Sequence, residues 1–143
     1  MIVHTQLCPL HVAELHDGTL RFFAPPDGEP AFPWCELEGV RQAAGVRQPP
    51  IEFALAVRTK YPQACRVLGS DAGPVTFVSL ALGQAVFAAA QREGLRTEQD
   101  ERLFLEEASF ALWTLLERLP EHERAPYFIA ADAAYWAEVG RAE

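Results

Sequence analysis

The sequence lacks the cysteine spacings that are typical of disulfide scaffolds and structural zinc sites. Cys8, Cys35 and Cys65 are widely separated, their number is odd, and no C-x-x-C pair is present. A secreted disulfide scaffold would leave one of the three thiols unpaired. We therefore expect three reduced, mostly buried thiols in a cytoplasmic protein.

Long apolar runs and targeting segments are also lacking. The most apolar stretch, residues 75–90, is interrupted by Thr76, Ser79, Gly83 and Gln84, whereas a membrane helix needs about 18 or more nearly uninterrupted apolar residues. Residues 1–6 have no basic region followed by a long apolar one. The sequence predicts neither a secretory signal nor a membrane partner.

The common catalytic motifs are absent. The chain has no G-x-S-x-G, no Gly-Lys-Ser/Thr phosphate loop, no G-x-G-x-x-G and no H-E-x-x-H. The charges of 121–123 and of 106–107 lie on adjacent helical positions, which do not share one face and are typical of a solvated surface. We expect a non-enzymatic protein with no catalytic residue, no cofactor and no identified small-molecule ligand; an enzyme with a less obvious site would require a deep cleft.

A metal site is a second possibility that the sequence disfavours. Cys8, His11, His16 and Asp17 lie close together and are zinc-ligand types. Their spacing matches no common structural-zinc pattern. His11 and His16 are also an odd number of residues apart, which places them on opposite faces of a strand. We therefore expect no metal.

Positive charge is scarce overall but concentrated locally. The net charge is −8 and the pI is near 5.0, which argues against a protein that binds nucleic acid with its whole surface. Residues 41–66, however, hold five basic residues against the single acid Glu52, a net charge of +4. Residues 92–124 hold five arginines against nine acids, a net charge of −4.

What is present indicates one α+β domain over residues 1–143, because this length and a 50% hydrophobic content fit a single core. Strands are predicted at 11–15, 19–23, 31–34, 65–68 and 74–78, as an N-terminal hairpin or meander plus a second strand pair in a small antiparallel sheet. Helices are predicted at 36–44, 50–60, 80–92, 97–119 and 126–139, with Gly45, Gly94 and Gly140 as ends. The C-terminal third, 97–143, is predicted to form a helical hairpin.

The dipeptide Asp17-Gly18 predicts the register of the first hairpin. If these two residues form the turn, Leu15 faces Leu20, Glu14 faces Arg21 and Ala13 faces Phe22. That arrangement places apolar pairs on one face and an opposite-charge pair on the other.

The segment 40–46 resembles the turn of a helix-turn-helix, with a small residue, Gly45 and Val46, followed by Ile51 as an apolar anchor in the next helix. The local positive charge suits a phosphate-facing element. The candidate DNA-binding residues are Arg41, Arg47, Arg58, Lys60 and Arg66. The alternative is that these two helices simply pack in the core.

The acidic C-terminal helices support a different hypothesis. Their apolar stripe is wider than a single contact line requires, so they could dock a protein partner or each other in a homodimer. Large aromatic side chains dominate interface energies. The candidate anchors are Phe104, Phe110, Trp113, Tyr135 and Trp136.

The order of elements resembles the N-terminal domain of phage antirepressors and the related Bro-N proteins. The matching segments are 20–23, 27–34, 37–46 and 74–80, within a region that spans roughly residues 11–94; residues 97–143 lie outside it. The resemblance implies a small regulatory protein of phage, plasmid or mobile-element origin that binds DNA or a repressor. The first hypothesis is thus DNA binding, and the alternative is an acidic protein-interaction module without DNA binding.

Overall fold

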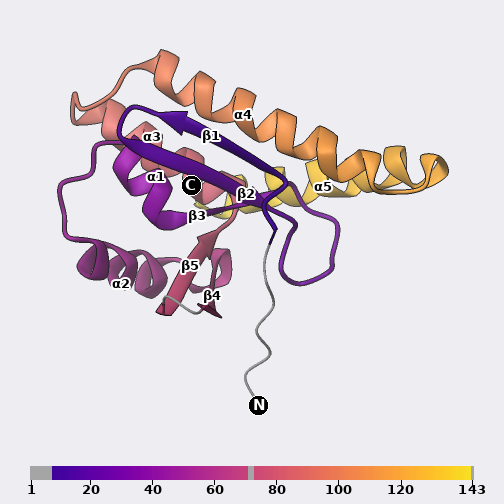
Figure 1. Ribbon diagram of the computed structural model, residues 1–143, viewed down its shortest axis with the longest axis horizontal. Coiled ribbons are helices and arrows are strands. Elements are labelled where there is room, and N and C mark those ends of the chain that lie inside the picture. The colour runs from indigo at the N-terminus through magenta and orange to yellow at the C-terminus, as the bar shows by residue number, and fades with distance from the viewer. Residues whose placement is uncertain (1–7, 71–72, 143) are drawn as a thin grey trace.

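A computed structural model of the chain describes residues 8–70 and 73–142 (Figure 1). Residues 1–7, 71–72 and 143 lie outside the described residues, and 71–72 fall between the predicted strands 65–68 and 74–78. The described residues form one antiparallel sheet and five α-helices, which confirms the predicted α+β class.

The two strand groups expected from the sequence join into one five-stranded sheet. Its order is β1-β2-β3-β5-β4, and every neighbouring pair is antiparallel. The short central strand β3 links the N-terminal hairpin to the second hairpin by pairing with both β2 and β5. The strand bounds are β1 His11–Leu15, β2 Gly18–Phe23, β3 Trp34–Glu36, β4 Cys65–Ser70 and β5 Gly73–Val78.

The helices gather on one face of this sheet. Three of them contact it directly: α1 against β2, β3 and β5, α3 against β3, and α4 against β1 and β2. Helix α2 lies beside α1, and α5 packs against α3 and α4. Figure 1 shows the α4–α5 pair extending well beyond the sheet. The helix bounds are α1 Leu37–Ala43, α2 Pro50–Lys60, α3 Leu80–Arg92, α4 Glu98–Glu117 and α5 Glu121–Ala142, with a 3-10 turn at Pro62–Ala64.

The core lies between the sheet and these helices. Phe22 of β2, Phe87 of α3 and Phe104 of α4 are fully buried, with ring centroids 5.7 Å apart for Phe22–Phe104 and 4.9 Å for Phe87–Phe104. A smaller cluster of Phe23, Trp34 and Phe77 forms a separate apolar group. Because α4 supplies Phe104 to the main core, the C-terminal helices are part of the same packing unit as the sheet.

The hairpin register differs from the prediction by two residues. Leu15 pairs with Gly18 and Ala13 with Leu20, so the turn residues are His16 and Asp17, and His16 has a φ of 53°. A register shift of two residues leaves each side chain on the same face of the sheet, so the buried side chains remain on the predicted side. Gly18 is needed for packing: a Cβ there would lie 2.4 Å from the Ala43 nitrogen of α1. Gly18 therefore lies in β2, at the point where α1 packs directly against the strand.

Two further boundaries were wrong. The third strand is Trp34–Glu36 rather than 31–34, since residues 34–36 are the ones that pair with β2 and β5. Helix α5 begins at Glu121 rather than at Pro126, and it continues through Gly140 to Ala142. Pro126 lies inside the helix, where the absence of its N–H removes one backbone hydrogen bond without ending the helix.

The three cysteines are free, as expected. Cys35 and Cys65 are buried, whereas Cys8 is exposed. Burial raises the pKa of the Cys35 thiol far above its ordinary value and that of Cys65 to about 11. Both buried thiols are therefore protonated at neutral pH and poor nucleophiles.

Candidate interaction surfaces

Two of the five cations predicted to bind DNA are paired with acids. The Arg41 guanidinium donates to both carboxylate oxygens of Glu38, at 2.7 and 2.8 Å, and to the carbonyls of Val46 and Gln48. The hydrogen-bonded Glu38 carboxylate raises the pKa of Arg41. Arg41 thereby holds the connection between α1 and α2 in place.

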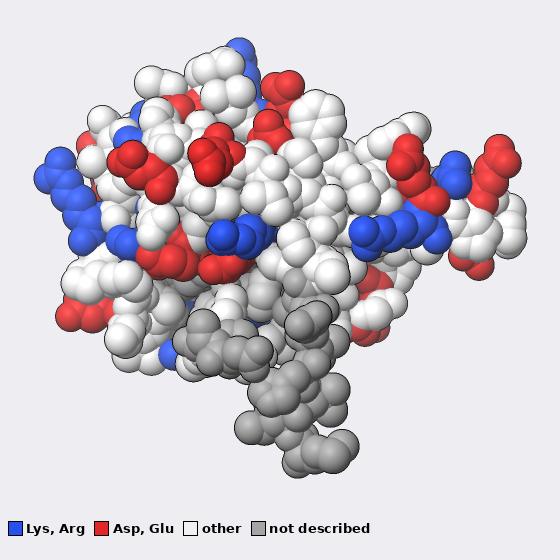
Figure 2. Space-filling model, viewed as in Figure 1, with Lys and Arg blue, Asp and Glu red and all other residues white. Residues whose placement is uncertain are grey.

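Arg66, in strand β4 of the second hairpin, also forms an ion pair with an acid. Its guanidinium donates to the carboxylate of Asp27 at 2.6 and 3.1 Å and lies over the Trp34 ring at 5.6 Å. Neither Glu38 nor Asp27 falls within residues 41–66. The net charge of +4 counted for that segment therefore overstates the positive electrostatic potential around it. In Figure 2 the basic side chains on the visible face are scattered among acidic ones.

The remaining three cations are more available. Arg47 and Lys60 are exposed, and Arg58 is half-buried. The buried Nε of Arg58 has no hydrogen-bond partner among the described residues.

The predicted helix-turn-helix is only partly present. Gly45 ends α1 with a φ of 76°, and its N–H bonds to the carbonyl of Gln42, as the turn requires. Ile51, expected to anchor α2, is instead 83% exposed, and Val57 is the buried residue of that helix. The first residues of α2, from Pro50 to Glu52, are all exposed.

The candidate partner-binding residues of the C-terminal helices differ in how far their side chains are exposed. Phe104 is fully buried in the core, so its assignment as a partner-binding residue was wrong: a side chain packed between Phe22 and Phe87 has no access to a partner. Phe110, Trp113 and Trp136 are 51%, 65% and 61% exposed. Figure 2 shows an uncharged stretch of surface over the second half of α4.

Tyr135 is half-buried and faces the body of the molecule. Its hydroxyl donates to the side-chain carbonyl of Gln84 on α3, and its ring contacts Phe32 at 5.6 Å. Burial raises the pKa of Tyr135, so the hydroxyl stays protonated and remains a donor at neutral pH. Its role is to dock α5.

Other side chains on the inner face of α5 complete this docking. The Tyr127 hydroxyl donates to the Ala31 carbonyl at 2.7 Å and accepts from the Ala31 N–H at 3.3 Å. The Ser79 hydroxyl donates to Glu138 at 2.5 Å, and Ala131 is fully buried. A small, half-open pocket lies beneath this helix, lined mostly by alanine and aromatic side chains, with Ser79 and Glu138 bonded to each other within it.

The opposite face of α5 is exposed and apolar. Ile129 is 68% exposed and Trp136 is 61% exposed. Among the α5 residues whose side chains are described, Ala131 alone is buried. The prediction named Trp136 but missed Ile129, although both residues lie within the predicted helix 126–139 and are seven residues apart. That spacing was the available signal.

Two histidines contact carboxylates of α4. His16 contacts Asp100 at 2.7 Å, and His11 contacts Glu107. They reach the same helix, contrary to the prediction of opposite faces, because His16 lies in the turn, where strand alternation no longer applies. Among the described residues no group of three or more His, Cys, Asp or Glu side chains is placed to hold a metal ion.

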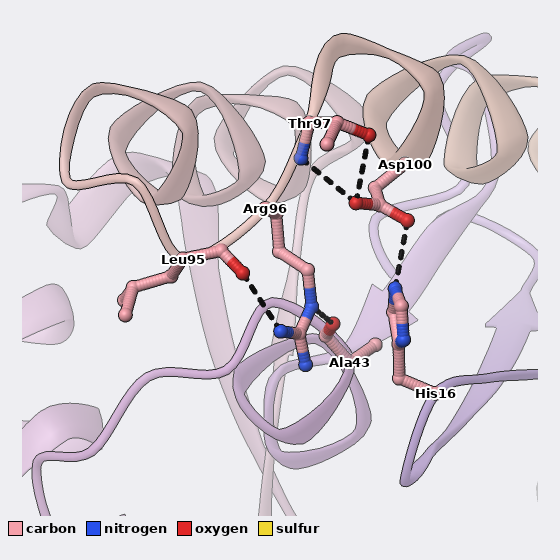
Figure 3. Close-up of polar contacts among 6 residues, drawn as sticks. All are labelled: His16, Ala43, Leu95, Arg96, Thr97 and Asp100. Carbon is pink, nitrogen blue, oxygen red and sulfur yellow. Dashed lines mark hydrogen bonds and ion pairs between the residues drawn. The ribbon is translucent and has the colours of Figure 1, made fainter.

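Asp100 joins the start of α4 to the turn between β1 and β2 (Figure 3). It accepts hydrogen bonds from the N–H and the hydroxyl of Thr97, which form a capping box, and it also contacts His16 of the hairpin turn. Beside it, Arg96 donates to the carbonyl of Ala43 at 2.7 Å, so a cation caps the C-terminus of α1. Burial opposes ionisation of Asp100, but these hydrogen bonds outweigh it and lower its pKa.

Comparison with known proteins identifies no relative. No family model matches the chain, and no curated protein and no solved structure is significantly similar to it. Within the described residues, none of the helices is both long and apolar enough to cross a membrane.

Proposed function

We propose that this protein is a non-enzymatic protein-interaction module that binds its partner through the C-terminal hairpin of α4 and α5. One observation carries the proposal: α5 is a helix of 22 residues that exposes three large apolar side chains, those of Phe128, Ile129 and Trp136. A solvent-facing helix face is ordinarily polar. Large exposed apolar side chains on one helix are typical of an interaction site.

The docking of α5 supports the proposal. Hydrogen bonds from Tyr127, Ser79 and Tyr135 hold the inner face of the helix against the body. The outer face is therefore presented on a fixed scaffold, which reduces the entropy cost of binding. Exposed tryptophans are the side chains most often found at energetically dominant interface positions.

A regulatory role in a reducing, cytoplasmic compartment is part of this proposal. Three free thiols in one chain favour that compartment. The resemblance of residues 11–94 to antirepressor domains supplies the regulatory part and remains a prediction.

Affinity capture from extracts of the source cells tests the proposal. The test bait is the triple variant Trp113→Ser/Ile129→Ser/Trp136→Ser, and the matched control is Ile51→Ser/Leu55→Ser, which removes equally exposed apolar side chains from α2. We expect wild type and control to retain a common partner, which is the chain itself or another protein, and the triple variant to lose it. Equal capture by all three baits would overturn the proposal.

DNA binding is the second candidate, favoured by two exposed cations: Arg47, which precedes α2, and Lys60, which ends it. Anisotropy with a duplex probe measures it at about 50 and about 200 mM salt, because phosphate-driven binding weakens steeply over that range. We expect Arg47→Ala/Lys60→Ala to weaken binding and Arg102→Ala, an exposed α4 arginine, to leave it unchanged. Absence of binding at low salt would exclude this candidate.

A further inference from the structure

The pocket beneath α5 combines aromatic walls with a single charged group. Phe32, Trp34 and Tyr135 line it, and Glu138 is the only charged residue among the described residues that do so. Apart from Ser79, the remaining lining residues are small or aliphatic: Ala31, Leu80, Ala81, Ala131 and Ala134. None of the exposed apolar side chains proposed above to bind a partner lines the pocket, so it is a separate site.

The Glu138 carboxylate has one oxygen engaged and one oxygen free. Its Oε2 accepts from the hydroxyl of the buried Ser79 at 2.5 Å, and the Leu82 N–H donates to that hydroxyl oxygen at the N-terminus of α3. Within residues 8–70 and 73–142, Oε1 has no hydrogen-bond partner and the carboxylate has no ion-pair partner. The N-terminus of α3 provides only partial positive charge. A bound cation would stabilise this part-buried carboxylate further.

The aromatic walls are held in fixed positions. The Phe32 and Tyr135 rings have centroids 5.6 Å apart and are inclined at 52° to each other. Trp34 is buried and already has one cation over its ring, the Arg66 guanidinium at 5.6 Å. Arg66 does not line the pocket, and its charge is balanced by Asp27. The ring electrons of these side chains attract positive charge.

We propose that this pocket binds an alkylated ammonium group, such as trimethylammonium, against the three rings and Glu138. An anion would be repelled by Glu138, and a neutral apolar group would desolvate its carboxylate without supplying a counter-charge. A bare ammonium is strongly hydrated and would lose that hydration against apolar walls. Methyl groups on the nitrogen keep the positive charge and contact the rings.

The size of the pocket fits a headgroup rather than a whole ligand. The pocket is half-open and has a volume of about 40 Å³. Because one bound water needs about 10–15 Å³, there is room for roughly three or four non-hydrogen atoms, as in a trimethylammonium group. The rest of the ligand would extend into solvent.

Titration of the full chain with choline, followed by NMR chemical shifts, tests the site. We expect saturable shifts at the Trp34 indole N–H and the Tyr135 amide, with a dissociation constant of about 0.1–10 mM for so small a ligand. The neutral analogue of choline, with carbon in place of the nitrogen, should bind at least about 10-fold more weakly, because it lacks the charge. Equal binding of the two compounds, or no saturable shift, would overturn the proposal.

Removal of the carboxylate charge tests the role of Glu138. Glu138→Gln keeps an oxygen that can accept from Ser79 but should weaken choline binding at least about 10-fold. The matched control is Asp132→Asn, the same kind of change on the same helix outside the pocket, and it should bind like wild type. Unchanged binding by Glu138→Gln would contradict the assignment.

A second pair of variants tests the location without touching the charge. Ala134 and Ala133 are both exposed, but only Ala134 lines the pocket. We expect Ala134→Leu to weaken choline binding about 10-fold by occupying the mouth, and Ala133→Leu to leave it unchanged. Circular dichroism verifies that the variants stay folded. An equal effect of both variants, or of neither, would place the ligand elsewhere.

Two sources share this chemistry, a free small molecule and a methylated lysine side chain of a protein. A peptide carrying one trimethyllysine distinguishes them: binding at least about 10-fold tighter than choline would identify a protein source, because residues beside the lysine then add contacts. Binding no tighter than choline would identify a small molecule. Choline binding with failure of the capture experiment would leave this site standing and overturn only the proposed function.

Discussion

Asp100 couples the stability of the protein to acid pH. Its pKa is lowered in the folded protein, so it contributes stability above its unfolded pKa near 4, and that contribution is lost as the pH falls through the folded pKa. We expect Asp100→Asn to lower the free energy of unfolding by about 1 kcal/mol at pH 7, the usual value of a helix cap. Urea denaturation should show the difference from wild type shrinking towards pH 3. An equal loss at both pH values would contradict this account.

Gly39 and Gly140 are both helical glycines, but their surroundings differ. A Cβ at Gly39 would lie 2.0 Å from the carbonyl oxygen of Thr19, whereas one at Gly140 would meet nothing within 4 Å. We expect Gly39→Ala to destabilise the protein by about 2 kcal/mol or more, because α1 must move away from β2. Gly140→Ala should stabilise it by about 0.5–1 kcal/mol. Thermal melts of both variants test this: the melting temperature should fall in Gly39→Ala and rise in Gly140→Ala.

At the scale of the element, Pro126 lies inside α5 at an exposed position. Pro126→Ala restores an N–H that can bond to the carbonyl of His122 and removes the clash of the ring with that turn. We expect an increase in stability of about 1–3 kcal/mol together with slightly higher helical ellipticity. A drop in melting temperature would show that the proline shapes the helix for docking.

Periodicity and turn chemistry predicted most elements because these signals are local. Helix α3 has the predicted bounds, and both strands of the second hairpin were found. The errors arose where contacts between elements far apart in the sequence set the register or the boundary of an element. Gly18 was assigned to the turn because nothing in the local sequence shows that α1 packs onto it.

The candidate sites were harder to predict for the same reason. Counting charges within residues 41–66 missed Glu38 and Asp27, which bind two of its arginines from outside. Hydrophobicity alone could not separate the buried Phe104 from the exposed Phe110 and Trp113 on the same helix. Burial depends on which face meets the sheet, and that information is not local.

At the scale of the whole molecule, residues 11–94 share their core with α4, so we expect that they do not fold as a separate unit. Phe104 of α4 fills the core between Phe22 and Phe87, and the loss of one such phenylalanine costs about 3–5 kcal/mol. A domain of this size has only about 5–15 kcal/mol of stability. We expect the fragment 1–96 to lack a cooperative thermal transition, measured by calorimetry, whereas the full chain shows one. A cooperative transition in the fragment would establish two units.

The positions of the three cysteines also allow transient opening of the core to be measured by thiol labelling. Cys8 is exposed, whereas Cys35 and Cys65 lie in the core. A thiol reagent added to the native protein should therefore label one site rapidly and the other two only as fast as the core transiently opens. The slow phase would report the unfolding rate at equilibrium, without denaturant and without an introduced label.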